Sequence, residues 1–370
     1  MPRVHLANTE NADMYYLIGT RIPDPFFFLE VEGKRTAILN ALEIGAFKEH
    51  ADPSVDAVPL EPFLTDARMI GGTQNRLCKL ALVVFEKYGL MKKEVAVPRA
   101  FPLDVADALR EAGARLIVQH LFLPERRIKT KTEIGYIREN LESTKVAFSY
   151  IEETLRNSEI DGSRIMHRGK ELTSEFLKEE VEKVLFDLKL DDVEGMIISS
   201  GAQAAMPHHK GKGAILPNTT IICDIFFRNR RNQYFGDMTR TYVKGMASET
   251  VMRMHAAVSR AQDAAFAALK PGASAKSVFE ASAHAIREAG FDVGEKGYIH
   301  SLGHGLGLEL HEAPNASPHS TETLVPGNVI TVEPGLYYPQ DGGVRIEDVV
   351  VVTERGYENL TDHPRDLIIP

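Results

Sequence analysis

The chain has 370 residues, more than most single domains contain, and this length predicts two domains with sizeable cores. A formal net charge of −9, with no basic run or aromatic-interleaved patch, argues against nucleic acid as a partner. The two cysteines, Cys78 and Cys223, are too few for a disulfide framework and are typical of reduced thiols in a cytosolic protein.

The N-terminal segment, residues 1–10, lacks the charged and then apolar layout of a signal peptide. No stretch of the sequence reaches the roughly 18 apolar residues of a membrane span. The sequence therefore predicts a cytoplasmic protein with neither nucleic acid nor a membrane among its partners.

Residues 1–125 alternate between short apolar runs and helical patterns, which is typical of an αβ domain. The expected strands cover 26–31, 36–39, 95–97 and 116–118, and the expected helices cover 77–88 and 103–112. No catalytic set of residues is visible in this part of the sequence. The domain either limits access of substrate, or makes an oligomer contact, or is purely structural, and the sequence leaves these alternatives open.

A charged stretch at 124–131 separates this domain from a second one, residues 126–370. Apolar residues then recur at helical spacing, namely Ile134, Ile137, Leu141, Phe148, Ile151 and Leu155. Two helix-rich segments, 134–190 and 248–289, each precede a hairpin that carries two acids, and this order hints at an internal duplication. The fold class predicted for the chain is α/β, of the α+β kind.

Four acids and one histidine of the second domain form the candidate site: Asp224, Asp237, His304, Glu333 and Glu347. The acids lie in or beside the apolar runs 220–227, 329–333 and 344–352, so their strands are expected to be buried. An ionised carboxylate taken out of water costs several kcal/mol unless cations, hydrogen-bond donors or a metal compensate it. Arginines are too few nearby to neutralise all four acids, so the set predicts a metal site.

The spacing of the acids groups them into two pairs. Asp224 and Asp237 flank the polar tip 228–232, and Glu333 and Glu347 flank the tip 339–343. Residues directly opposed across a hairpin point to the same face, with Cβ atoms roughly 5 Å apart. Each hairpin is therefore expected to present two carboxylates side by side, which with one histidine suffice for two divalent ions roughly 3.5–4 Å apart.

Five motifs surround these residues in a fixed order: Pro207-His208-His209, Asp237-Met-Thr-Arg-Thr241, Gly303-His304-Gly-Leu-Gly-Leu-Glu-Leu-His311-Glu, Glu333-Pro-Gly335 and Gly343-Val-Arg-Ile-Glu347-Asp348. In this order they resemble the pita-bread metallopeptidases of family M24, and most closely the proline-specific branch of prolidase and aminopeptidase P. The resemblance covers nearly the whole chain. It implies a C-terminal catalytic domain of curved antiparallel sheet with covering helices, preceded by a creatinase-like αβ domain, and a homodimer.

The resemblance also implies roles for particular residues. It makes Asp224, Asp237, His304, Glu333 and Glu347 the ligands of two metal ions, with Asp237 and Glu347 bridging. His208 and His311 match catalytic positions, and His300 and Tyr234 match positions around them. Arg345 shares a strand face with Glu347, and it either pairs with Asp237 or a neighbouring carboxylate or meets a carboxylate of the substrate.

The sequence departs from the family pattern in the first hairpin. Phe226 stands where the family has a glycine, and Gln233 replaces a second glycine. The hairpin is also two residues longer than is usual. These departures leave the shape of its tip open.

An oxygen-rich site with one imidazole favours Mn²⁺, with Co²⁺, Fe²⁺ and Zn²⁺ as alternatives. Two such ions lower the pKa of a bridging water towards neutrality and supply a hydroxide nucleophile. The resemblance implies that this hydroxide attacks the carbonyl before proline in small peptides with proline in second position. Glu333 is then expected to carry the proton to the leaving nitrogen, while His208 and His311 hydrogen-bond the tetrahedral intermediate.

Other functions stay open on the sequence alone. Within the branch, a dipeptidase and an aminopeptidase are not distinguished. A non-peptidase metal-dependent hydrolase or lyase, or a catalytically silent binding module, is also compatible with this fold. Methionine aminopeptidases usually lack such an N-terminal domain, and creatinase-type hydrolases lack the metal ligands. His311-Glu312 does not begin an HExxH zinc helix, because the second histidine is absent and Pro314 would break the helix.

Overall fold

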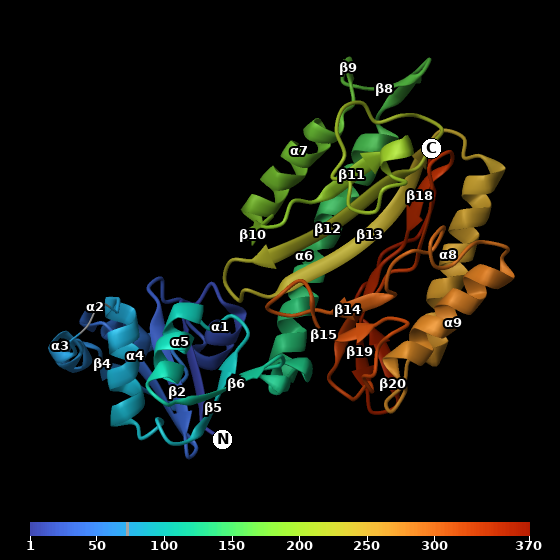
Figure 1. Cartoon of the computed structure of the whole chain (residues 1–370). Helices are drawn as coiled ribbons and strands as arrows, with labels where there is room; N and C mark the ends of the chain where they lie inside the picture. The colour runs from blue at the N-terminus through green and yellow to red at the C-terminus, as the bar shows by residue number, and fades with distance from the viewer. Residues whose placement is uncertain (72–73) are drawn as a thin grey trace. The chain divides into compact units, whose positions relative to one another are not determined.

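The computed structural model describes residues 1–71 and 74–370, and it divides into two compact units, Met1–Pro124 and Glu125–Pro370 (Figure 1). Each unit has hydrophobic cores of its own. Within the described residues, every helix is too short or too polar to cross a lipid bilayer.

The N-terminal unit is built on one six-stranded mixed sheet with the order β4-β3-β2-β1-β5-β6. Its strands are β1 (Arg3–Ala7), β2 (Phe26–Val31), β3 (Lys34–Leu39), β4 (Val55–Pro59), β5 (Glu94–Pro98) and β6 (Arg115–Gln119). Its helices are α1 (Ala12–Ile18), α2 (Ala41–His50), α3 (Glu61–Met69), α4 (Arg76–Lys87) and α5 (Leu103–Glu111). All four expected strands and both expected helices of this unit are confirmed.

Both faces of this sheet are covered, as the sequence of β2 requires. Phe27 and Leu29 pack into one core with α4 and α5, whereas Phe26 and Phe28 pack into a second core with α1 and α2. Successive side chains of a strand point to opposite faces, so an uninterrupted apolar run is what a sheet buried on both sides needs.

The C-terminal unit contains two sets of helices and strands, and in each set a helix pair comes before the strands that carry the candidate acids. The first set comprises α6 (Lys131–Arg156), β7 (Glu159–Asp161), β8 (Arg164–His167), β9 (Lys170–Glu171), α7 (Ser174–Asp187), β10 (Leu190–Asp191), β11 (Ile197–Ser200), the 3₁₀ turn η2 (Gly201–Gln203), β12 (Ile221–Asn229) and β13 (Phe235–Lys244). The second set comprises α8 (Glu249–Ala268), α9 (Ala275–Glu288), β14 (Gly303–Gly305), β15 (Glu312–Ala316), β16 (Val329–Val332), β17 (Gly335–Tyr338), β18 (Gly342–Arg345), β19 (Asp348–Thr353), β20 (Gly356–Asn359) and β21 (Ile368–Ile369). A helix pair followed by an antiparallel hairpin thus occurs twice, as the sequence suggested.

The strands form two main sheets, each with helices on one face. One has the order β10-β12-β13-β21, with β11 also paired to β12, and the other has the order β15-β14-β16-β19-β20. Alternate residues of β12 and β13 pack on α6 and α7, while alternate residues of β16 and β19 pack on α8 and α9. Figure 1 shows β12 and β13 as a long curved pair, with α8 in gold and α9 in orange to the right of the red strands.

Because the odd-numbered residues of β12 fill the helix-side core, the even-numbered residues face the other way. The opposite parity holds for β16, where Ile330 and Val332 are in the core and Thr331 faces away. The faces turned away from the helices carry the candidate ligands. A β-bridge between Thr239 and Glu347 joins the two sheets there.

Candidate metal centre

Strands β12 and β13 supply Asp224 and Asp237, but in a register other than the one predicted. Asp224 is paired with Thr239, and Asp237 is paired with Phe226. The prediction that the two aspartates oppose each other directly is therefore wrong by two residues. They still share a face, because a shift of two preserves the alternation of side chains.

The tip of this hairpin explains the shift. The Asn229 side chain accepts a hydrogen bond from the Arg231 amide (2.8 Å), and the Asn232 side chain accepts one from the Tyr234 amide (3.0 Å), so local side-chain turns close the loop over 230–234. Gln233, at a position where the family has glycine, has φ +65°, the left-handed region that favours glycine. Asparagine-closed turns of this kind are not visible in hydrophobic spacing.

Glu333 and Glu347 lie opposite each other, as the spacing predicted. Val332 pairs with Asp348 on one side of them and Gly335 pairs with Arg345 on the other, so one register runs through both ladders. The two glutamates occupy the break between the ladders, next to Pro334, which has no amide hydrogen to donate. Thr239 holds Glu347 in place, since its hydroxyl donates to Glu347 Oε2 at 2.7 Å.

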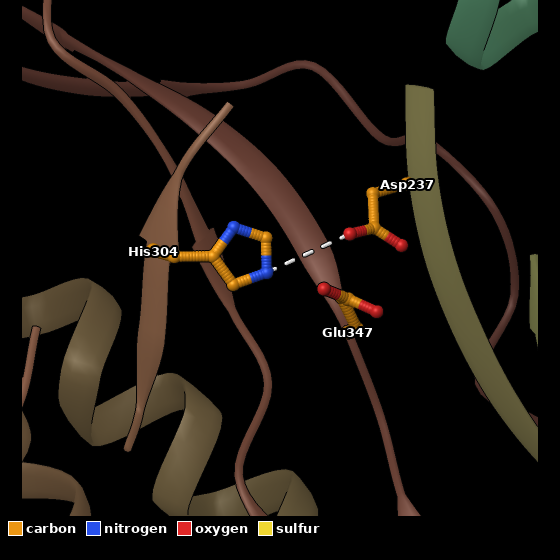
Figure 2. Close-up of side chains that lie close together, drawn as sticks. All are labelled: Asp237, His304 and Glu347. Carbon is orange, nitrogen blue, oxygen red and sulfur yellow. Dashed lines mark ion pairs between the residues drawn. The ribbon is translucent and has the colours of Figure 1, made fainter. Parts of the chain in front are cut away.

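His304 on β14 completes the cluster (Figure 2). Its Nε2 lies 3.3 Å from Glu333 Oε1 and 3.7 Å from Asp237 Oδ2. Its Nδ1 lies 3.1 Å from the carbonyl oxygen of Gly305, which can only accept, so Nδ1 carries the proton and Nε2 is left for a cation. Ligand atoms of Asp237, His304 and Glu347 all lie within 4.8 Å of one another.

The carboxylates of the cluster are buried without enough protein partners. Asp237 is 3% exposed and Glu347 is 2% exposed. Among the described residues, Asp224 Oδ1, Asp237 Oδ1 and Glu347 Oε1 are buried with no hydrogen-bond partner. Buried carboxylate oxygens are normally satisfied, so three orphans that face one cluster fit a site for cations.

The electrostatics of the cluster lead to the same conclusion. Burial, and then the charge of Asp224, raise the pKa of Asp237 well above its ordinary value, and burial and Asp237 do the same to the pKa of Glu347. Burial also raises the pKa of Glu333, but the hydrogen bond and charge of His304 outweigh it and hold that pKa at about 2. Burial lowers the pKa of His304, yet Glu333 and Asp237 raise it to about 9. Four oxygen ligands and one imidazole suit two hard or borderline divalent ions, which would replace these protons.

The guanidinium of Arg345 forms an ion pair with a carboxylate of the cluster. Its partner is Asp224 rather than Asp237. Its Nη2 donates to Asp224 Oδ2 at 2.6 Å, and its Nη1 donates to the Tyr337 hydroxyl at 2.7 Å. His300 Nδ1 lies 2.7 Å from the Ser301 carbonyl, so its Nε2, 2.9 Å from the Tyr337 oxygen, accepts the phenolic proton. The chain His300–Tyr337–Arg345–Asp224 thus fixes one carboxylate, which favours the ligand-holding role for Arg345.

Sequence reasoning missed Tyr337 and Thr239. Tyr337 is buried, and burial raises its pKa to about 12, so it stays a neutral donor. Strand alternation gives the signal that would have found it, because positions 333, 335 and 337 of one hairpin arm share a face. Thr239 could have been found in the same way, two residues beyond Asp237.

His208 and His311 differ from the cluster in being exposed. The His311 ring lies 4.2 Å from the His304 ring, centroid to centroid. Partial burial, and then the charge of His304, lower the pKa of His311, and His208 lowers it further. The structure therefore brings His311 against His304 of the cluster, and His208 acts on His311 through its charge.

Tyr234, which was expected beside the substrate, contacts the helix α6 instead of one of the five candidate ligands in the contacts that the structure gives for its hydroxyl. Its hydroxyl donates to Glu133 Oε1 at 2.6 Å. The other oxygen of Glu133 accepts from the Thr130 amide in the capping box that begins α6. Tyr234 therefore fastens the β12–β13 hairpin to α6.

The fold and the cluster define a metal-dependent hydrolase built on two helix-covered sheets. The model of metallopeptidase family M24 matches residues 136–354, and the chain belongs to this family. This confirms the resemblance, and structures of prolidases share the fold: the prolidase from Pyrococcus furiosus superposes with a TM-score of 0.78 at 27% identity, covering 98% of this chain and 97% of that one. An X-Pro aminopeptidase from Thermotoga maritima gives a TM-score of 0.75 at 26% identity, covering 99% and 97%.

Two of the curated relatives of this chain are named as dipeptidases. The Xaa-Pro dipeptidase of Pyrococcus furiosus is 36% identical over 66% of this chain, and the match spans 65% of that relative, just under two thirds of its length. A probable dipeptidase PepE of Mycobacterium tuberculosis is 28% identical over 98% of this chain and 91% of its own length.

Proposed function

We propose that this chain is a peptidase that hydrolyses the bond before proline in small peptides, with two divalent ions held by Asp224, Asp237, His304, Glu333 and Glu347. The observation that carries the proposal is the set of three orphaned carboxylate oxygens, on Asp224, Asp237 and Glu347. Relatives named Xaa-Pro dipeptidase and X-Pro aminopeptidase support the choice of substrate.

Two divalent ions, when bound, supply Lewis acidity and bring the pKa of water towards neutrality. The chain's own residues then divide the remaining work. Glu333 has the most accessible side chain of the four carboxylates, 18% against 4% for Asp237, and it is the one suited to accept a proton and pass it to the proline nitrogen. His208 and His311, at the exposed side, would hydrogen-bond the substrate as its carbonyl carbon becomes tetrahedral.

Further parts of the proposal concern the whole protein. The oxygen-rich donor set favours Mn²⁺ over Co²⁺, Fe²⁺ and Zn²⁺. We assign residues 1–125 to a creatinase-like N-terminal domain and 126–370 to the catalytic domain, in a homodimer. The two buried free thiols, Cys78 and Cys223, support a cytoplasmic location.

Release of amino acids from two peptides tests the activity. Metal-stripped protein is assayed on Gly-Pro and on Ala-Pro-Ala, with and without added Mn²⁺. Cleavage of the dipeptide alone, restored by Mn²⁺, identifies a dipeptidase, and cleavage of the tripeptide identifies an aminopeptidase. If Mn²⁺ binds and neither peptide is cleaved, the substrate is wrong and another hydrolase or lyase activity of this fold takes its place.

A further inference from the structure

A buried group of charges lies directly behind His311, outside the metal cluster. Glu312, the next residue, has a side chain only 8% exposed. Its Oε2 accepts from Arg126 Nη2 at 2.5 Å, and its Oε1 accepts from Lys129 Nζ. The Lys129 side chain is 1% exposed, so this ion pair is almost fully removed from water.

Arg126 contacts the loop on both sides of His311. Besides Glu312 it donates to Glu309 Oε2 at 2.7 Å. The loop also packs closely on Glu312 itself, since a Cβ at Gly307 would collide with the Glu312 carboxylate. A Cβ at Gly303 or Gly305 would likewise collide with the backbone of Thr331 or Ala313, so all three glycines serve close packing of this segment.

The two cations are themselves held in place. Lys129 Nζ donates to the Arg126 carbonyl at 2.7 Å, and the Lys129 amide donates to the Gly327 carbonyl at 2.8 Å. The Asn328 side chain donates to the Arg127 carbonyl at 2.8 Å. Gly327 and Asn328 directly precede β16, so the segment that holds the His311 loop is also tied to the strand that leads to Glu333.

We propose that Arg126 and Lys129 are positioning residues that hold His311 against the metal cluster through Glu312, a role that rests on the proposed function. An exposed histidine on a loop samples several rotamers and backbone positions, whereas a group in a catalytic site must be held to within a fraction of an ångström. Misplacement by about 1 Å costs on the order of 100-fold in rate. A buried ion pair on the adjacent residue fixes the backbone from which the imidazole extends.

The test is a double-mutant cycle between Lys129→Met and His311→Ala, with Lys145→Met as the matched control. Lys145 pairs within α6 with Glu142, whose side chain is 61% exposed, and neither residue contacts the Glu312 group in the contacts that the structure gives, so Lys145→Met should leave kcat/KM unchanged. We expect Lys129→Met to lower kcat/KM by about 10- to 100-fold in the wild-type background. In the His311→Ala background we expect it to cost less than about 3-fold, because the residue through which it acts is gone.

A loss of the same factor in both backgrounds would make Lys129 merely structural, and no loss in either would also overturn the proposal. If Lys129→Met does not fold, Glu309→Ala replaces it, since the Glu309 side chain is 55% exposed. Its loss should be smaller, about 3- to 10-fold, and again confined to the background that retains His311.

Hydrogen exchange of the same variants separates this proposal from the peptidase assignment. Lys129→Met should speed amide exchange in residues 306–312 while exchange in α8 and α9 stays unchanged. If the wild-type protein cleaves neither proline peptide, the peptidase assignment fails, and hydrogen exchange alone tests whether Arg126 and Lys129 position the His311 loop. Faster exchange confined to residues 306–312 in Lys129→Met supports this positioning role. Unchanged exchange in these residues overturns it.

Discussion

Glu333 differs from the other three carboxylates of the cluster in its partners and its accessibility. It contacts His304, and the Thr331 hydroxyl donates to its Oε1 at 3.2 Å, so it is not among the orphaned oxygens. Burial raises its pKa, but His304 brings it to about 2, so Glu333 is ionised at neutral pH. An ionised and partly accessible carboxylate is in the form that can accept a proton.

Replacement of Glu333 by Gln should therefore abolish turnover while the fold is retained. The amide keeps the shape of the side chain but cannot accept a proton, and general acid–base groups contribute on the order of 10²- to 10⁴-fold. Steady-state kcat on the cleaved proline peptide measures the loss, and circular dichroism checks the fold. Glu358→Gln, in the exposed pair with Arg138, is the control. A Glu333→Gln enzyme with ordinary kcat would refute the assignment.

Tyr234 is the residue for which structure and family position give different roles. If its hydroxyl only fastens the hairpin to Glu133, Tyr234→Phe should lower the free energy of unfolding by about 1.5–3 kcal/mol, the range for a lost hydrogen bond to a charged group. The kcat/KM of the variant should change by less than about 2-fold. Urea denaturation and peptide assays measure the two quantities, with the neighbouring, exposed Tyr136→Phe as control. A variant with unchanged stability and a much lower kcat/KM would instead support a role for Tyr234 in substrate binding or catalysis.

At the scale of elements, the long helix α6 is joined to β13 and to the C-terminal segment by one carboxylate. Glu152 Oε1 accepts from the Tyr242 hydroxyl at 2.7 Å and contacts His363 Nε2 at 2.8 Å. A buried pair next to it, Arg240 with Asp348 at 2.8 Å, ties β13 to β19. These contacts fix β13, the strand that carries Asp237, to α6 and to β19.

Glu152→Gln should cost about 1 kcal/mol at pH 7, because neutral hydrogen bonds replace charge-assisted ones. Burial raises the pKa of Glu152, but the bonds from His363 and Tyr242 outweigh it and hold the pKa below its ordinary value of 4.5. A group whose pKa is lowered by folding stabilises the protein above its ordinary pKa and loses that contribution as the pH falls through the lowered value. Chemical denaturation at several pH values should therefore show the wild-type advantage shrinking below pH 4.5. An advantage that persists unchanged to pH 2 would contradict this account.

The sequence predicted those elements in which the spacing of apolar residues matches the face that is buried in the structure. The run 26–31 and the helix 77–88 bury continuous apolar faces, and both were predicted. Helix α2 buries only Phe47, so it has no apolar face to recognise. The β12–β13 register was missed because asparagine turns at the tip set it, whereas the β17–β18 register follows directly from symmetric spacing. The contacts of Arg345, Tyr337 and Glu312 depend on side chains more than 100 residues apart or on alternation within short strands, and residue type alone does not give them.

At the scale of the C-terminal unit, the candidate ligands lie where its two sheets join. Asp224 and Asp237 come from one sheet and His304 from the other, and the Thr239–Glu347 bridge links the two. Negative charges of both halves meet there with one guanidinium, Arg345, in direct contact. Without cations, the carboxylates at this junction either repel one another or bind protons. With cations bound, the same carboxylates crosslink the two halves of the unit.

Removal of divalent metal should therefore lower thermal stability, and the effect should grow with pH. A ligand at 100 times its Kd stabilises the folded state by about 2.7 kcal/mol. Burial raises the pKa of Asp237 and of Glu347, so ion binding must displace protons, and the increase in Tm on adding Mn²⁺ should be larger at pH 8 than at pH 6. Glu347→Gln should lose most of this increase, since it removes one ligand oxygen's charge, whereas Glu358→Gln should keep it. Calorimetry with stripped and Mn²⁺-loaded protein measures both. An equal Mn²⁺-induced shift in wild type and Glu347→Gln would mean that the stabilising ion binds somewhere other than this junction.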